Sequence, residues 1–266
     1  MWQTNEYGKK KMKIRICILT VIIIGTGYIQ AIGQQRIDRQ FWQDVVLDYQ
    51  LGKNLLETEL SYQTLLAQEN KWYSLNISPA YERSINKYFD LICALPMSYT
   101  VQTDTSNSFE IRTMLGGRVY FTPGKRIETR FTYRFEYRFF HDQSSSEWVK
   151  SSRSRFRAEV IVPINRPNYY SDKMLYCLGD VELFSTVDKD VEERYANRFR
   201  IRVGAGYRMS YNWRFEAIYM LQQSRNNVED GYNSVDNILR LRIKCYFPFQ
   251  KKKVMNTPGP EGGSGY

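Results

Sequence analysis

The sequence contains a single histidine, His141, together with only four cysteines and eight prolines in 266 residues. One histidine excludes a histidine-rich metal centre, and any mechanism that needs an imidazole base must use His141. Four cysteines are too few to build a chain of this length on disulfides. Few prolines and an aromatic content of 15% exclude an intrinsically disordered chain.

Long apolar runs are also absent after Gly33, so no transmembrane helix is expected there. Before that point, residues 9–15 read KKKMKIR, residues 16–24 read ICILTVIII, and Ala31-Ile32-Gly33 offers a small-x-small cleavage site. This order predicts a cleaved secretory signal peptide over residues 1–33. The alternative is a membrane anchor, but the apolar run is shorter than the ~20 residues that a spanning helix needs.

Two further features follow from this N-terminus. Met12 is a possible true start, because residues 1–11 add nothing that a signal peptide needs. Cleavage would leave Cys93, Cys177 and Cys245, an odd number that does not suggest a disulfide framework in an exported protein.

The rest of the sequence is dominated by long segments in which apolar and polar residues alternate. Between Ile127 and Arg138, odd positions carry Ile, Thr, Phe or Tyr, and even positions carry Glu, Arg or Thr. Because a strand sends successive side chains to opposite faces, one face is aromatic and aliphatic and the other is charged. We predict strands in eleven such segments: 41–51, 54–64, 71–82, 87–100, 109–121, 126–140, 153–162, 173–184, 198–208, 213–222 and 239–249.

Short connections alternate with long polar ones between these segments, as in an antiparallel meander closed into a membrane barrel. We therefore expect an all-β fold, an antiparallel up-and-down transmembrane β-barrel of 10–12 strands over residues 34–250. Bacterial single-chain barrels normally have an even number of strands, which favours ten or twelve. Residues 251–266 are rich in Lys, Gly and Pro, and we expect a disordered tail there.

The alternation alone fits either a soluble β protein with its apolar face inside or an outer-membrane barrel with its apolar face in lipid. Segments of twelve or more residues are long for soluble strands, which centre near ~5–6. Bulky aromatics lie toward the segment ends, as in an interfacial girdle, and the last strand ends CYFPF. With the predicted export, these features favour the bacterial outer membrane.

Particular residues also resemble a known family. The Phe41-Trp42 start with Asp44 and Tyr49, followed by a tight turn and Glu59-Leu60-Ser61-Tyr62, resembles the opening of the domain of unknown function 2490 family. The arginine–aromatic alternation at 130–138 and 153–157 is similar too. That family consists of predicted bacterial outer-membrane β-barrel proteins without an established activity, so the resemblance implies a fold and no functional residues. It covers residues 41–249, and the tail beyond Phe249 departs from barrels that end at a terminal aromatic.

The strongest polar feature is the set of charged residues that share the presumed inner face. Arg153, Arg198, Arg208 and Arg214 lie on it by alternation. Our candidates for lining the lumen are Arg112, Arg118, Arg130, Arg134, Arg138, Arg155, Arg157, Arg200, Arg202, Arg240, Arg242, Glu128, Glu136, Glu159 and Glu216. One interpretation is an anion-attracting pore or cavity. The other, which we favour, is an internal salt-bridge network that fills a narrow barrel.

Other chemistry is sparse. His141 begins HDQSSSE, and a serine–histidine lipid hydrolase of the outer membrane is the alternative function, against an incidental histidine in a polar loop. Gly204-Ala205-Gly206 lies within a strand and lacks the third glycine of a dinucleotide fingerprint, so glycine there more plausibly relieves crowding or bends the strand. We expect no enzyme activity, no cofactor and no metal.

The net charge of +10 invites a nucleic-acid interpretation, and a soluble exported protein that binds a polyanion is the third possibility. However, residues 1–33 contribute +4 and residues 250–266 contribute +2, and most of the remainder is arginine alternating with glutamate. We therefore expect a structural or solute-passage role in the outer membrane, with membrane lipids and the barrel-assembly machinery as partners and no nucleic acid.

Overall fold

The computed structural model describes residues 36–66, 72–101, 107–143, 147–186, 196–226 and 231–248. The signal peptide expected over residues 1–33 and the tail expected over residues 251–266 lie outside these ranges. Within them, no helix is long and apolar enough to cross a membrane.

The described chain forms twelve strands, and all except β4 and β5 have at least twelve residues. The strands are β1 (Arg36–Leu51), β2 (Asn54–Leu65), β3 (Tyr73–Asn86), β4 (Phe89–Ala94), β5 (Met97–Val101), β6 (Ser108–Tyr120), β7 (Glu128–Asp142), β8 (Trp148–Pro163), β9 (Met174–Thr186), β10 (Ala196–Arg208), β11 (Trp213–Asn226) and β12 (Gly231–Pro248).

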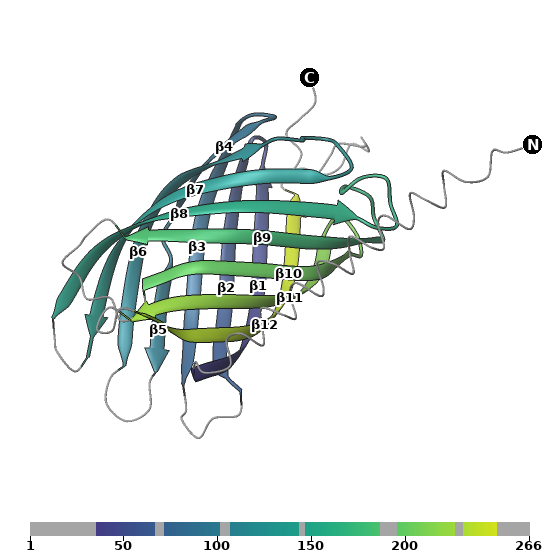
Figure 1. Ribbon diagram of the computed structural model, residues 1–266. Helices are drawn as coiled ribbons and strands as arrows, with labels where there is room; N and C mark the ends of the chain where they lie inside the picture. Colours follow the sequence, from purple (N-terminus) through teal and green to yellow (C-terminus); the bar gives the residue numbers. More distant parts are fainter. Residues whose placement is uncertain are drawn as a thin grey trace, which may run out of the picture. The chain divides into compact units, whose positions relative to one another are not determined.

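The sheet closes on itself because β1 pairs with both β2 and β12. Figure 1 shows the result: the strands wrap around a common interior, and in this view β9–β11 pass in front of β2 and β3. Each consecutive pairing from β1 to β12 is antiparallel. The predicted all-β barrel of ten to twelve strands is therefore confirmed.

The barrel nevertheless has an odd number of positions. β4 and β5 both pair with β3 and β6, so the twelve strands occupy eleven positions around the wall. Eleven positions agree with the eleven alternating segments of the sequence and differ from the even number that we expected. With ten antiparallel steps between them, β1 and β12 run in the same direction, and the closing pair is parallel.

The segment expected as one strand over residues 87–100 is divided at Leu95 and Pro96. Proline has no backbone N–H and cannot donate to the ladder. The pairing continues on both sides, because the Leu95 N–H donates to the Pro79 carbonyl and the Arg112 N–H donates to the Pro96 carbonyl. The break is therefore local, and the wall stays closed.

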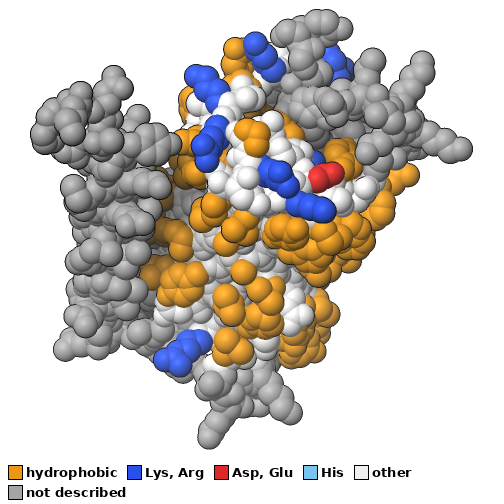
Figure 2. Space-filling model, turned by 90° about the vertical axis from the view of Figure 1, so that its right-hand side faces the viewer, with side chains coloured by type: hydrophobic (Ala, Val, Ile, Leu, Met, Phe, Trp, Pro, Cys, Tyr) orange, Lys and Arg blue, Asp and Glu red, His pale blue; other side chains and the backbone are white. Residues whose placement is uncertain are grey.

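The two faces of the wall have opposite chemistry, and burial is inverted relative to a soluble protein. Side chains that point outward are apolar and exposed, such as Val203 at 53% and Leu183 at 50%, whereas Glu136 on the inner face is 0% exposed. In Figure 2 hydrophobic side chains cover much of the visible wall, and most of the Lys and Arg side chains lie toward its upper part. A hollow of about 840 Å³ in the wall is also lined mainly by apolar side chains, including Val45, Leu60 and Leu75.

The two ends of the barrel also differ. The connections β1–β2, β3–β4, β6–β7, β8–β9 and β10–β11 meet at one end and are described in full; we call it the turn end. Apart from the β4–β5 break, which lies within the wall, the other five connections meet at the opposite end, the loop end, and each includes residues outside the described ranges. β1 begins at the loop end, because the parallel closing pair places the start of β1 beside the start of β12.

Candidate functional site

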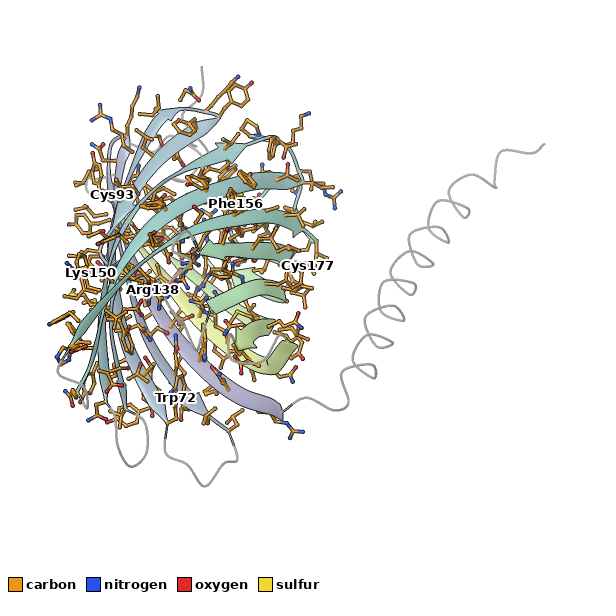
Figure 3. All side chains as sticks on the ribbon, turned by 60° about the vertical axis from the view of Figure 1, so that its left-hand side comes forward. Trp72, Cys93, Arg138, Lys150, Phe156 and Cys177 are labelled. Atoms are coloured by element: carbon orange, nitrogen blue, oxygen red, sulfur yellow. The ribbon has the colours of Figure 1, made fainter. Side chains whose placement is uncertain are left out.

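The interior of the barrel is an ion-pair network built by strand register. In neighbouring strands, Glu136 faces Arg153, Arg157 faces Glu182, and Asp180 faces Arg202. Because these positions alternate with apolar ones, all of them point inward, and the register brings opposite charges to adjacent positions. Figure 3 shows nitrogen-bearing side chains gathered in the space that the strands enclose, with Cys93 and Cys177 outside.

The centre of this network is the chain Arg153–Glu136–Arg155–Glu182 across β7, β8 and β9. Glu136 accepts hydrogen bonds from Arg153 Nη2 at 2.5 Å and from Arg155 Nη1 at 2.6 Å. Arg155 Nη2 then donates to Glu182 Oε1 at 2.6 Å. Each carboxylate bridges guanidinium groups and is almost fully buried, so these are charge-assisted bonds with little competition from water.

Glu182 extends the network to β10. Its Oε2 accepts from Arg200 Nη1 at 3.1 Å and lies 3.5 Å from Arg202 Nη2. Asp180, the next inward acid on β9, bridges Arg202 Nε at 2.6 Å and Arg157 Nη2 at 3.0 Å. Two acids of β9 therefore hold arginines from strands on both sides of them.

Further pairs join the remaining strands. Arg118 makes a two-pronged contact with Glu82, with both N–O distances at 2.9 Å, and Arg130 makes the same contact with Glu159. Arg138 Nε lies 2.5 Å from Glu110. Two bonds in parallel fix the guanidinium plane, which makes these contacts rigid as well as strong.

The ring of charges also closes across the parallel pair of strands. Arg240 of β12 donates to Asp44 of β1 and, at 2.9 Å, to Glu59 of β2. Arg242, two residues along β12, lies 3.3 Å from Glu216 of β11. The two contacts of Arg240 join residues that are 196 and 181 positions apart, so they help to fix the closure of the barrel.

The structure places the charged residues predicted from the sequence as follows. All of the lumen candidates have the alternation of the inner face, and each of them except Arg134 has an ion pair with a carboxylate or guanidinium among the described residues. The side chain of Arg198 lies outside the part of the molecule that the structure describes. Several acidic partners were missed: Asp44, Glu59, Glu82, Asp90, Asp180 and Glu182.

A second arrangement, at the turn end, was not predicted. The β8–β9 turn folds inward and buries Tyr169, which is 2% exposed. Tyr169 Oη accepts a hydrogen bond from Arg214 at 2.5 Å, and its carbonyl accepts one from Arg208 at 3.1 Å. The Arg214 guanidinium lies between the rings of Tyr169 and Tyr246, 4.7 and 4.5 Å from their centroids. We call these four residues the turn-end layer.

Tyr176 continues this layer into the barrel. Its hydroxyl donates to Glu216 at 2.7 Å, and its ring lies where a Cβ at Gly206 would be. Only glycine at that position leaves room for the ring, so the expectation that this glycine relieves crowding is confirmed. In the neighbouring β10–β11 turn, burial raises the pKa of the Tyr211 phenol.

Among the described residues, the single histidine contacts an aromatic ring and is not paired with a hydroxyl group. His141 lies opposite Trp148 in the β7–β8 pairing, and the two rings are 5.0 Å apart. Ser144, Ser145 and Ser146, the hydroxyl groups proposed to accompany it, lie outside the described residues. The contact that the structure gives His141 is therefore aromatic packing near the loop end.

Three of the four cysteines lie in the described residues, and Cys93, Cys177 and Cys245 are all free thiols. All lie at outward-facing positions, where they pack as small apolar side chains. In the described part of the chain, no group of His, Cys, Asp and Glu has the composition of a metal site.

The family model described as a protein of unknown function (DUF2490) matches residues 39–233. A search of curated proteins found no match.

Proposed function

Because the chain belongs to the DUF2490 family, whose description assigns no function, we propose a role from its geometry: a bacterial outer-membrane β-barrel whose interior is closed by its own charged side chains. In this proposal the outer face contacts lipid, and the protein has a structural role in the membrane instead of serving as an open pore. Export by residues 1–33 is part of the proposal.

The observation that carries this proposal is the inverted burial of the two faces. Outward positions on eleven of the twelve described strands, all except β5, include large apolar side chains that are more than a third exposed, from Val45 on β1 to Phe247 on β12. Soluble monomers rarely expose contiguous apolar patches of more than a few hundred Å². In a membrane the same surface is favourable, and a closed barrel satisfies every strand's backbone hydrogen bonds.

A filled interior is favoured over an open pore by the pairing of its charges. An anion pore needs cations that are free to meet a passing solute. Here the described inner-face arginines other than Arg134 bind neighbouring carboxylates or the turn-end tyrosines, and the turn-end layer covers one end with side chains such as Arg208 and Arg214, each 1% exposed. The proposal therefore assigns the arginines to holding the walls of a narrow barrel together.

The remaining assignments follow from the same surfaces. A polyanion binder needs cations on its outer face, whereas here the arginines named above lie inside. We propose no enzyme activity, because His141 packs on Trp148.

Lipids and the barrel-assembly machinery are the proposed partners. The assembly machinery would recognise the aromatic end of β12 at Tyr246 and Phe247.

Fractionation of a Gram-negative host that expresses the full chain tests the proposed location. We expect the protein in the outer-membrane fraction, released by detergent and not by high salt. Folded protein should migrate faster than boiled protein on a gel, because a closed barrel resists the detergent until it is heated. Recovery in the soluble periplasmic fraction would contradict the proposal.

A further inference from the structure

One inner-face arginine differs from its neighbours. Among the described residues, Arg134 of β7 has no hydrogen bond or ion pair, and its Nε is buried without an acceptor. Arg155, directly opposite in the β7–β8 register, contacts two carboxylates. The difference is therefore one of partners, since both residues occupy the same layer of the barrel.

The surroundings of Arg134 are strongly positive. Arg155, Arg118 and Arg157 are the neighbouring cations whose charges repel it. The acids that attract it are Glu182, Glu82 and Glu59. Each of them pairs directly with other arginines instead: Glu182 binds Arg155 and Arg200, Glu82 binds Arg118, and Glu59 binds Arg240.

A second donor, one layer away on the facing strand β8, also lacks an acceptor. The Nε of Arg157 is buried and makes no hydrogen bond within the described structure. Arg157 lies opposite Thr132, which is two residues from Arg134 on the same face of β7. Buried donors without acceptors are rare, because each one costs about 1–3 kcal/mol. Two in adjacent layers of facing strands indicate that an acceptor belongs between them.

The wall is also shaped to accommodate Arg134. Its register partner on β6 is Gly116, where a Cβ would lie 2.2 Å from the Tyr133 carbonyl oxygen and 3.0 Å from the Arg134 Cγ. Glycine thus allows the side chain to lie against β6. Arg157 and Arg118 keep 19% and 13% of their side-chain surface accessible, so this part of the interior is open to a small solute.

We propose that Arg134 and Arg157 bind a phosphate-type oxyanion inside the barrel, with Arg118 beside them. Tetrahedral oxyanions offer several acceptors to guanidinium N–H groups and cancel their charge, which chloride does less well. The turn-end layer closes the opposite approach, so the anion enters from the loop end. The anion site rests on the proposed function in one respect, because it requires a folded barrel. It does not depend on the membrane location.

Inorganic phosphate is the probe. We expect phosphate to raise the thermal unfolding temperature of the purified, detergent-solubilised full chain above its value in sodium chloride of equal ionic strength. In Arg134→Gln the phosphate affinity obtained from that shift should fall about tenfold or more, because charged hydrogen bonds are lost. The matched control is Arg166→Gln, which removes the same charge from an exposed turn position and should leave the shift unchanged.

A second measurement guards against a folding defect. Arg134→Gln should fold, because no carboxylate loses its ion-pair partner, and this is checked by heat-dependent mobility on a gel. Broadening of the phosphorus-31 resonance of phosphate by the protein should then be present in wild type and lost in Arg134→Gln. Equal broadening by the two folded proteins, or equal stabilisation by chloride and phosphate, would overturn the anion site. Fractionation tests the membrane location separately.

Discussion

Replacement of Glu182 by Gln is expected to lower the free energy of unfolding by about 3–5 kcal/mol, because it removes one partner of a buried ion pair. Glu182 is 1% exposed and bridges Arg155 and Arg200. Arg155 keeps Glu136, but Arg200 keeps only the neutral amide of Gln222. A buried cation without a carboxylate is left behind, and its desolvation is no longer offset.

Urea unfolding of the refolded barrel, followed by tryptophan fluorescence, measures this loss. Glu147→Gln is the matched control, since it makes the same chemical change at an exposed position before β8. The double replacement Glu182→Gln with Arg200→Gln should recover part of the loss, because the stranded charge is removed too. A Glu182→Gln change as small as that of the control would show that the interior is wet and weakly coupled.

Val203→Arg is expected to destabilise the barrel by about 2–4 kcal/mol when it is folded in lipid vesicles. Val203 lies near the middle of β10, faces outward and is 53% exposed. In water such a surface replacement typically changes stability by only about 0.5 kcal/mol. The large cost arises only if this position contacts the hydrocarbon core of a membrane.

The control for this replacement is Phe121→Arg, at an exposed position in the β6–β7 turn. At the membrane boundary the cost falls to about 0–1 kcal/mol. Unfolding in urea, measured from the same vesicles, compares the two variants directly. Equal and small effects at both positions would place water, not lipid, against the outer wall.

Alternation alone was sufficient to predict both faces of the strongest strands. In β7 the inward Glu136 and the outward Phe135 and Tyr137 follow directly from period two, because the backbone geometry of a strand determines the face. The break at Pro96 was harder to predict, since proline occurs at strand edges and in turns as well. Its effect depends on the pairing to β3 and β6, which the local sequence does not contain.

The partners of the charged residues could not be predicted from alternation. Asp180 and Glu182 lie on the segment 173–184, whose pattern is weaker because Met174, Tyr176 and Leu178 are apolar and also point inward. Arg240 meets Asp44 only when the barrel closes, and register between such distant segments is not encoded in period two. The lack of an ion-pair partner for Arg134 among the described residues is likewise a property of the assembled network.

Tyr169 illustrates a different limit. Its segment is a polar turn between two strands, and turns usually remain at the surface. Nothing in the local sequence indicates that the β8–β9 turn folds back into the barrel. Its position is favoured by Arg208 and Arg214 on two other strands, which supply donors and a cation for the ring.

The central claim is that the protein spans a membrane while its own side chains close the interior. It is tested most directly by the conductance of the purified protein in planar lipid bilayers, recorded for wild type and Tyr169→Ala. Heat-dependent mobility on a gel verifies that both proteins are folded before they are added to the bilayers. We predict a nearly silent wild type and larger current steps for Tyr169→Ala, which removes the ring that covers Arg214. Wide, steady channels in the wild type, unchanged by Tyr169→Ala, would contradict the account.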